Sequence, residues 1–341
     1  LFCNLDYMFI INNYFFAVFF CVITMLCWGS WANTQKLSSK KWPFQLFYWD
    51  YTLGILLITL ILAFTLGSTG DYGRPFIIDL QQANLSFVKS AFIGGVIFNF
   101  ANLLLVIAIE ITGMAIAFPI GIGIALVLGV FTNYIAQPEG DPTILIIGVC
   151  LVTLAIIIDG IAYKKILQNS DQTPLRGILI SVLAGITMGF FYKYVAESMV
   201  TDFVNPEAGK ITPYSALVVF SIGILLSSFL FNTFNMYNPI SGEKTNFKEY
   251  ITLGSLKLHL IGVLGGVIWG LGMSFNILAS EQAGPAIAYG LGQGATMVAA
   301  IWGVFIWKEF KELPVESNWL IPVMFLLFIA GISCVILAKL I

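Results

Sequence analysis

Long apolar runs separated by short polar connections set the pattern of this chain. Ten runs of about 20 residues end at charged residues or at Pro and Gly clusters, and one helix needs about 20 apolar residues to cross a bilayer. The runs lack the alternation of barrel strands, so they predict helices. The expected segments are 14–34, 46–66, 88–109, 114–136, 143–163, 177–199, 213–236, 258–280, 284–307 and 319–340. The fold class is therefore all-α, a polytopic membrane protein with ten transmembrane helices.

The composition excludes a water-soluble globular protein. Charged residues make up 10% of the 341 residues and the mean hydropathy is +0.92, whereas soluble domains are roughly 25% charged. The net charge of −2 supplies no positive field that would hold nucleic acid, so membrane lipid and a small-molecule substrate are the expected partners. The five cysteines show no CxxC spacing and His259 is the single histidine. We therefore expect no disulfide framework, no metal site and no cofactor.

Basic residues gather on one side of the expected topology. The connections that follow odd-numbered segments hold eleven Lys and Arg residues, and the opposite connections hold four. Because cytoplasmic loops are enriched in Lys and Arg, we expect both termini outside the cytoplasm, in the inner (plasma) membrane of a bacterium. The segment 14–34 has no basic residue before it and no cleavage site after it, so we expect it to be retained. Residues 1–13 are taken as an N-terminal extension, with Met8 as a candidate start and no function assigned to 1–7.

Two stretches 171 residues apart repeat one another. Residues 94–123 and 265–294 align without a gap and are identical at twelve of thirty positions, including the pair Glu110 and Glu281. The stretches lie five segments apart, and five is odd, so the two halves are expected to have opposite orientations in the membrane. Inverted repeats are typical of transporters, in which two halves rock about a central site. The expected divisions are a first five-helix repeat over 14–163, a cytoplasmic linker over 164–176 and a second five-helix repeat over 177–341.

Four motifs carry a family resemblance. They are CWGSWANTQK (27–36), FYWDY (47–51), GG-x-x-x-N-x-x-N (94–102) and GVFTNY (129–134). These motifs resemble the drug/metabolite transporter superfamily and, within it, the glucose/ribose porter and ureide permease-like group. The resemblance implies ten helices as two inverted repeats, and transport of sugars, ureides and nucleobases, or amphipathic metabolites. The connection 163–176 is short here, whereas some plant ureide permeases carry a long central loop.

Uncharged polar and aromatic residues at mid-membrane depth are the candidate substrate-binding residues, because polar groups there are costly. Aromatic faces beside amides suit a neutral, flat, polar solute. For the asparagine pair the alternative is hydrogen bonding between helices, and for the first two tryptophans it is an interfacial aromatic belt. The candidates are Trp28, Trp31, Asn33, Asn99, Asn102, Trp269 and Gln293.

Three carboxylates are candidates for coupling or gating. Asp50, beside Trp49 and Tyr51, could bind a coupling proton or anchor the helix at the interface. Glu110 and Glu281 lie at symmetry-related junctions, where they could act as gates or could be solvated. No catalytic residues are assigned, because the chain lacks a cluster of nucleophile, base or metal ligands.

The sequence therefore favours a secondary active transporter that moves a small neutral polar metabolite by alternating access, with a coupling proton as an option. A sugar is the leading substrate class. A ureide or nucleobase permease, or a metabolite or drug exporter, is the alternative within the same superfamily. A channel or membrane receptor is the alternative outside transport, and a membrane-embedded enzyme is the least favoured.

Overall fold

The structure is a computed structural model, and it describes residues 7–38, 42–112, 114–166 and 175–341. Within these residues ten spans are long and apolar enough to cross a membrane. They comprise α1 (Tyr14–Ser30) with α2 (Ala32–Ser38), α3 (Phe44–Phe64), α5 (Leu85–Thr112), α6 (Met114–Ala136), α7 (Pro142–Ile166), α8 (Leu175–Ser198), α9 (Pro213–Tyr237), α11 (Leu256–Ala283), α12 (Pro285–Gly292) with α13 (Ala295–Ile301) and the π-helical turn η1 (Trp302–Ile306), and α14 (Leu320–Leu337). The all-α fold and the ten spans predicted from the sequence are confirmed.

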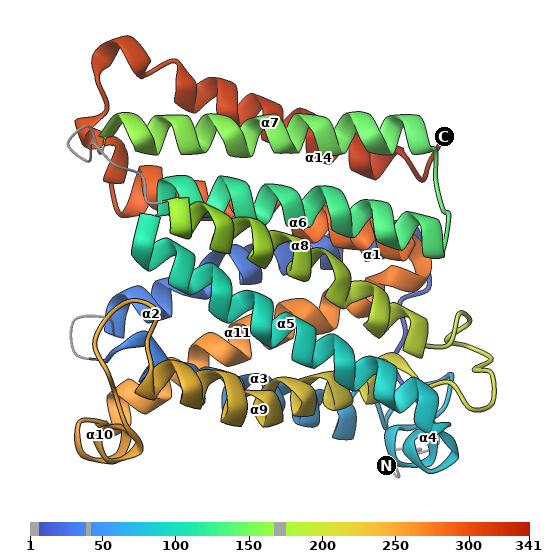
Figure 1. Cartoon of the computed structure of the whole chain (residues 1–341). Helices are drawn as coiled ribbons and strands as arrows, with labels where there is room; N and C mark the ends of the chain where they lie inside the picture. Colours follow the sequence, from blue (N-terminus) through green and yellow to red (C-terminus); the bar gives the residue numbers. More distant parts are fainter. Residues whose placement is uncertain (1–6, 39–41, 113, 167–174) are drawn as a thin grey trace.

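The helices run side by side in one elongated bundle, with α7 and α14 along one edge and α3 and α9 along the other (Figure 1). Helix α5 packs against α8 and α9, and five spans later α11 packs against α1 and α3. Helices α6 and α12, which hold corresponding parts of the two repeats, also pack together. The two helices that carry the matching stretches of sequence, α5 and α11, thus pack against helices that also lie five spans apart along the chain.

The double glycines of the repeat explain this packing. A Cβ on Gly95 would lie 2.1 Å from the carbonyl oxygen of Phe220 in α9, and a Cβ on Gly266 would lie 1.9 Å from that of Tyr51 in α3. No side chain fits in either place, so glycine is required for these helices to approach. The same motif therefore performs the same packing task in both halves.

The ninth span differs from the prediction. The sequence suggests one segment over 284–307, but α12 ends at Gly292 and α13 begins at Ala295. The Trp28 ring occupies the space beside Gly292, where a Cβ would lie 2.7 Å from its Cζ3 atom. The interruption at Gln293 and Gly294 therefore accommodates an aromatic side chain of α1. Discontinuous helices of this kind line substrate sites in many transporters.

Short helices in the connections mark the two ends of the bundle. Helices α2 and α10 (Phe247–Thr252) lie at one end, and α4 (Phe76–Gln82) lies at the other (Figure 1). Two 3-10 turns, η2 (Glu309–Glu312) and η3 (Val315–Ser317), connect the ninth and tenth spans. Residues 8–11 pack at the α4 end, where the Met8 N–H donates to the Tyr72 carbonyl at 2.6 Å.

Candidate functional site

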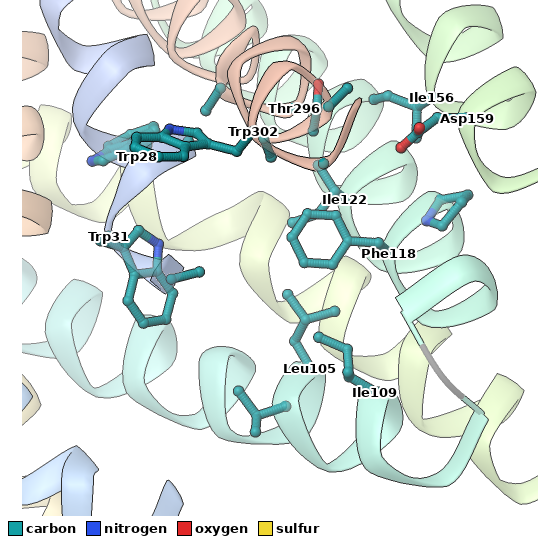
Figure 2. Close-up of a pocket in the computed structure, with 18 of the residues that line it drawn as sticks. Trp28, Trp31, Leu105, Ile109, Phe118, Ile122, Ile156, Asp159, Thr296 and Trp302 are labelled. Atoms are coloured by element: carbon teal, nitrogen blue, oxygen red, sulfur yellow. The ribbon is translucent and has the colours of Figure 1, made fainter. Parts of the chain in front are cut away.

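A cavity of about 400 Å³ lies inside the bundle and reaches the end that carries α2. Its walls come from both halves of the chain: from α1, α2, α5, α6 and α7 of the first half, and from α8, α11 and the interrupted ninth span of the second. Figure 2 shows Trp28 and Trp31 on one side of this space, with Phe118 and Asp159 on the other. The cavity is thus lined by side chains from both halves of the chain.

Stacked aromatic rings form the deep part of the cavity. The Trp28 and Trp269 rings are nearly parallel, with an interplanar angle of 10° and centroids 5.8 Å apart. The Trp28 indole N–H donates to the Trp269 carbonyl at 3.2 Å, which fixes its orientation. On its other flank Trp269 contacts Phe98, with ring centroids 4.4 Å apart. The cavity therefore offers rigid, flat surfaces on which a ring-shaped solute can lie.

Amide and hydroxyl groups border these rings. Asn102 lines the cavity and donates from Nδ2 to the Tyr48 hydroxyl at 3.2 Å. Gln293 lines it from the interruption between α12 and α13, and Thr296 lines it from the first turn of α13. These groups carry no formal charge, so they can hydrogen-bond a neutral solute without requiring it to carry a charge.

Asn99, one turn before Asn102, is absent from the cavity wall. Its side chain is fully buried, its Oδ1 accepts from the Tyr48 hydroxyl at 2.7 Å, and its Nδ2 donates to Ser227 Oγ at 2.7 Å. Asn99 therefore joins α5 to α3 and α9, and the alternative of hydrogen bonding between helices describes this half of the pair. Of the two asparagines, Asn102 remains the candidate for substrate contact.

The mouth of the cavity is held by a charged and aromatic network. The Lys36 ammonium pairs with Glu309, whose other oxygen accepts from the Tyr163 hydroxyl. The same ammonium lies 4.2 Å from the Trp307 ring centroid, and the Trp307 indole N–H donates to Asn33 Oδ1 at 2.6 Å. This network ties α2 to the ends of the fifth and ninth spans.

Two further carboxylates face the cavity near its mouth. Glu110 is an exposed lining residue at the end of α5. Asp159 in α7 lies near Glu309, and its buried Oδ1 has no hydrogen-bond partner within the described residues. Acidic charge is thus confined to the mouth, while the deep aromatic part is uncharged.

The opposite end of the bundle is closed by the connections that follow α3 and α8. Arg74 pairs with buried Asp79 at 2.7 Å, and the second Asp79 oxygen accepts from the Thr212 N–H at 2.7 Å. The Glu281 carboxylate at the end of α11 accepts from the Phe203 N–H at 2.6 Å. The two repeat-related glutamates therefore differ: Glu110 faces an open mouth, and Glu281 is bonded within a closed end.

Asp50 lies outside the cavity, in a cluster at the α10 end of α3. It accepts from the Tyr250 hydroxyl at 2.6 Å, and its two oxygens lie 3.0 Å from His259 Nδ1. Burial and the neighbouring Asp50 carboxylate raise the pKa of Tyr250. This cluster joins α3 to α10 and α11, and it gives Asp50 an anchoring environment without contact with the cavity.

The structure thus brings together most of the residues proposed from the sequence. Seven line the cavity: Trp28, Trp31, Asn33, Asn102, Glu110, Trp269 and Gln293. Three lie elsewhere: Asn99, Asp50 and Glu281. Sequence reasoning did not select Lys36, Phe118, Asp159, Tyr163, Thr296, Trp302, Trp307 and Glu309. Most of these lie near the ends of spans, where tryptophans and charges are also typical of an ordinary membrane interface.

Comparisons with known proteins cover nearly the whole chain. A family model described as "Ureide permease" matches residues 47–169 and 159–339. Ureide permease 1 of Arabidopsis thaliana is 22% identical over 93% of this chain and 95% of its own length. A Streptococcus pyogenes protein whose name refers to sugar uptake is 22% identical over 89% of this chain and 93% of its own. A solved crystal structure aligns with a TM-score of 0.60 and 11% identity over 96% of this chain and 99% of its own, which shows a shared fold.

Proposed function

Because the chain belongs to the ureide permease family, we propose that it is a secondary transporter for a small neutral polar metabolite with one flat or apolar face. Sugars and cyclic ureides both have this chemistry. The observation that carries the proposal is the stacked pair Trp28 and Trp269 beside the amide of Asn102 in one cavity. Stacking on the rings would hold the less polar face, while the amides would hydrogen-bond the rim.

The arrangement of charge supports a neutral cargo. The carboxylates of Glu110, Asp159 and Glu309 lie at the mouth, and the nearby Lys36 is paired with Glu309. An anionic solute bound against the deep aromatic rings would leave water without a fixed partner of opposite charge, which is costly at this depth. A neutral solute avoids that cost.

We further propose that the cavity faces the cytoplasm and that transport proceeds by alternating access between the two repeats. The mouth lies at the ends of the first, third, fifth and ninth spans, which is the side that the distribution of Lys and Arg places inside. A movement that seals the mouth of the cavity and breaks the contacts at the Glu281 end would expose the same site to the other side of the membrane. In a bacterium this orientation would place both termini outside the inner membrane.

Counterflow in proteoliposomes tests the proposal. Vesicles loaded with unlabelled allantoin or glucose should accumulate the matching labelled solute transiently, because a carrier exchanges solute across the membrane. Accumulation of only one of the two would identify the substrate class. Flux that is independent of solute on the far side would contradict alternating access and indicate a channel.

Ureides and sugars are the two candidate substrate classes. The matching family model is described as ureide permease, and a relative that matches 89% of this chain is named for sugar uptake. The aromatic floor does not separate the two classes, since the C–H face of a sugar ring and the plane of a ureide ring both stack on tryptophan. Competition of each solute against the other in the counterflow assay ranks them directly.

A further inference from the structure

A second hollow lies on the lipid-facing side of the bundle. This groove, of about 760 Å³, runs between α6, α7 and α8, and its lining is apolar apart from Thr153 and Lys164. Ile157, Ile161 and Ile186 in its walls are each more than two-fifths exposed. The groove therefore presents an open apolar channel at the level of the membrane core.

The two repeats differ at this position. Gly123 lines the groove, and a Cβ added to it would meet nothing within 4 Å. Its repeat partner Gly294 is packed: a Cβ there would lie 2.7 Å from Met25 of α1 and 3.0 Å from Ile332 of α14. Side chains of the protein thus fill the space beside Gly294, whereas the corresponding space beside Gly123 is open to the surrounding membrane.

A basic group stands at the end of the groove. Lys164 is exposed in the last turn of α7, and within the described part of the chain it forms no ion pair. Its neighbour Lys165 is bound elsewhere, to Ser317 Oγ at 2.8 Å.

Filling an apolar groove with a lipid tail improves contact but gains little hydrophobic energy, because the tail is already in an apolar medium. Selectivity must therefore come from the headgroup, and the Lys164 ammonium favours an anionic one.

We propose that this groove is a binding site for an anionic phospholipid, with one acyl chain between α6, α7 and α8 and the headgroup phosphate on Lys164. Pro119 and Gly160 line both the groove and the central cavity. The bound chain therefore lies one layer of residues away from the proposed substrate site. The proposal needs only that the chain spans a membrane, so it is independent of which solute is carried.

Native mass spectrometry of the whole protein tests the site. Protein in micelles doped with phosphatidylglycerol or phosphatidylcholine of the same acyl chains should retain one lipid, with the anionic lipid bound about fivefold more tightly. Lys164→Gln should remove that preference. Gly123→Leu should reduce retention of both lipids, because the new side chain projects into the groove from a position where an added Cβ meets nothing within 4 Å. Lys257→Gln, which removes an exposed lysine outside the groove, is the matched control and should leave binding unchanged.

Four results would overturn the proposal. Equal retention of the two lipids by the wild type would mean that Lys164 does not select an anionic headgroup. Full retention by Gly123→Leu, with its melting temperature unchanged, would place the lipid outside the groove. A lipid-free dimer would mean that a second copy of the chain covers this face. Competition by glycerol phosphate would show an anion site without an acyl-chain requirement, and it would also contradict the proposal.

Discussion

Phe98 and Trp269 occupy the same position in the two repeats and contact each other, with ring centroids 4.4 Å apart and planes inclined by 30°. Phe98 in turn contacts Phe191 of α8, and Trp269 stacks on Trp28 of α1. The aromatic floor of the cavity is therefore assembled from matching residues of both halves. A movement of one repeat against the other would act directly on this contact, and hence on any solute resting on it.

Replacing Trp269 should weaken substrate binding. Trp269→Ala removes the ring that stacks on Trp28, and we expect about a tenfold higher dissociation constant, whereas Trp269→Phe should recover part of the loss. Binding is measured by isothermal titration of the purified protein. Phe305→Ala is the matched control, because this ring is 61% exposed and is not a lining residue. An unchanged affinity in Trp269→Ala would move the binding site away from the aromatic floor.

Replacing the two asparagines of α5 one at a time should distinguish an effect on substrate binding from an effect on folding stability. Asn102→Ala should raise the dissociation constant of the substrate with a small change in melting temperature. Asn99→Ala should lower stability, by about 1 to 3 kcal/mol, because the buried Tyr48 hydroxyl loses its acceptor and the Ser227 hydroxyl loses its donor. Titration and thermal unfolding of both variants provide the comparison. The reverse pattern would contradict the assignment of Asn102 to the cavity and Asn99 to helix packing.

Removing each of the two repeat-related glutamates should have a different effect on which end is open. Glu281→Ala removes the acceptor for the Phe203 N–H and should favour the state open at that end. A cysteine at Ala32 in the cavity, in a background without the native cysteines, reports this through its reaction with an impermeant maleimide. We expect slower labelling from the mouth side in Glu281→Ala and no slowing in Glu110→Ala. Equal rates in all three proteins would rule out Glu281 as part of the closure.

Any proton coupling should depend on Asp159 more than on Asp50. Asp159 lines the cavity with one buried oxygen lacking a partner among the described residues, whereas Asp50 is occupied by Tyr250 and His259. Asp159→Asn should therefore abolish accumulation driven by a pH gradient while leaving counterflow intact. Asp50→Asn should mainly lower the melting temperature. Loss of pH-driven accumulation only in Asp50→Asn would restore the coupling role that the sequence suggested for it.

The sequence alone determined the layout of this protein in the membrane. Its apolar runs are long enough to span a bilayer and too continuous for strands, so the ten spans follow from the energetics of burying backbone in lipid. The match between Gly95 and Gly266 is visible in the sequence, and the structure gives both residues the same packing task, since only glycine lets two helix backbones come so close. These properties depend on residue type and spacing, which a single sequence displays.

The tertiary structure decided which polar residues share a space. Asn99 and Asn102 are equivalent by spacing, but only the direction of α5 relative to α3 places Asn99 between helices and Asn102 in the cavity. Asp50 and Asp159 likewise both lie near the ends of spans, and the groups that surround them, Tyr250 and Glu309 respectively, come from segments far away along the chain. Periodicity shows the face of a helix on which a residue lies. What that face meets depends on the packing of the other helices.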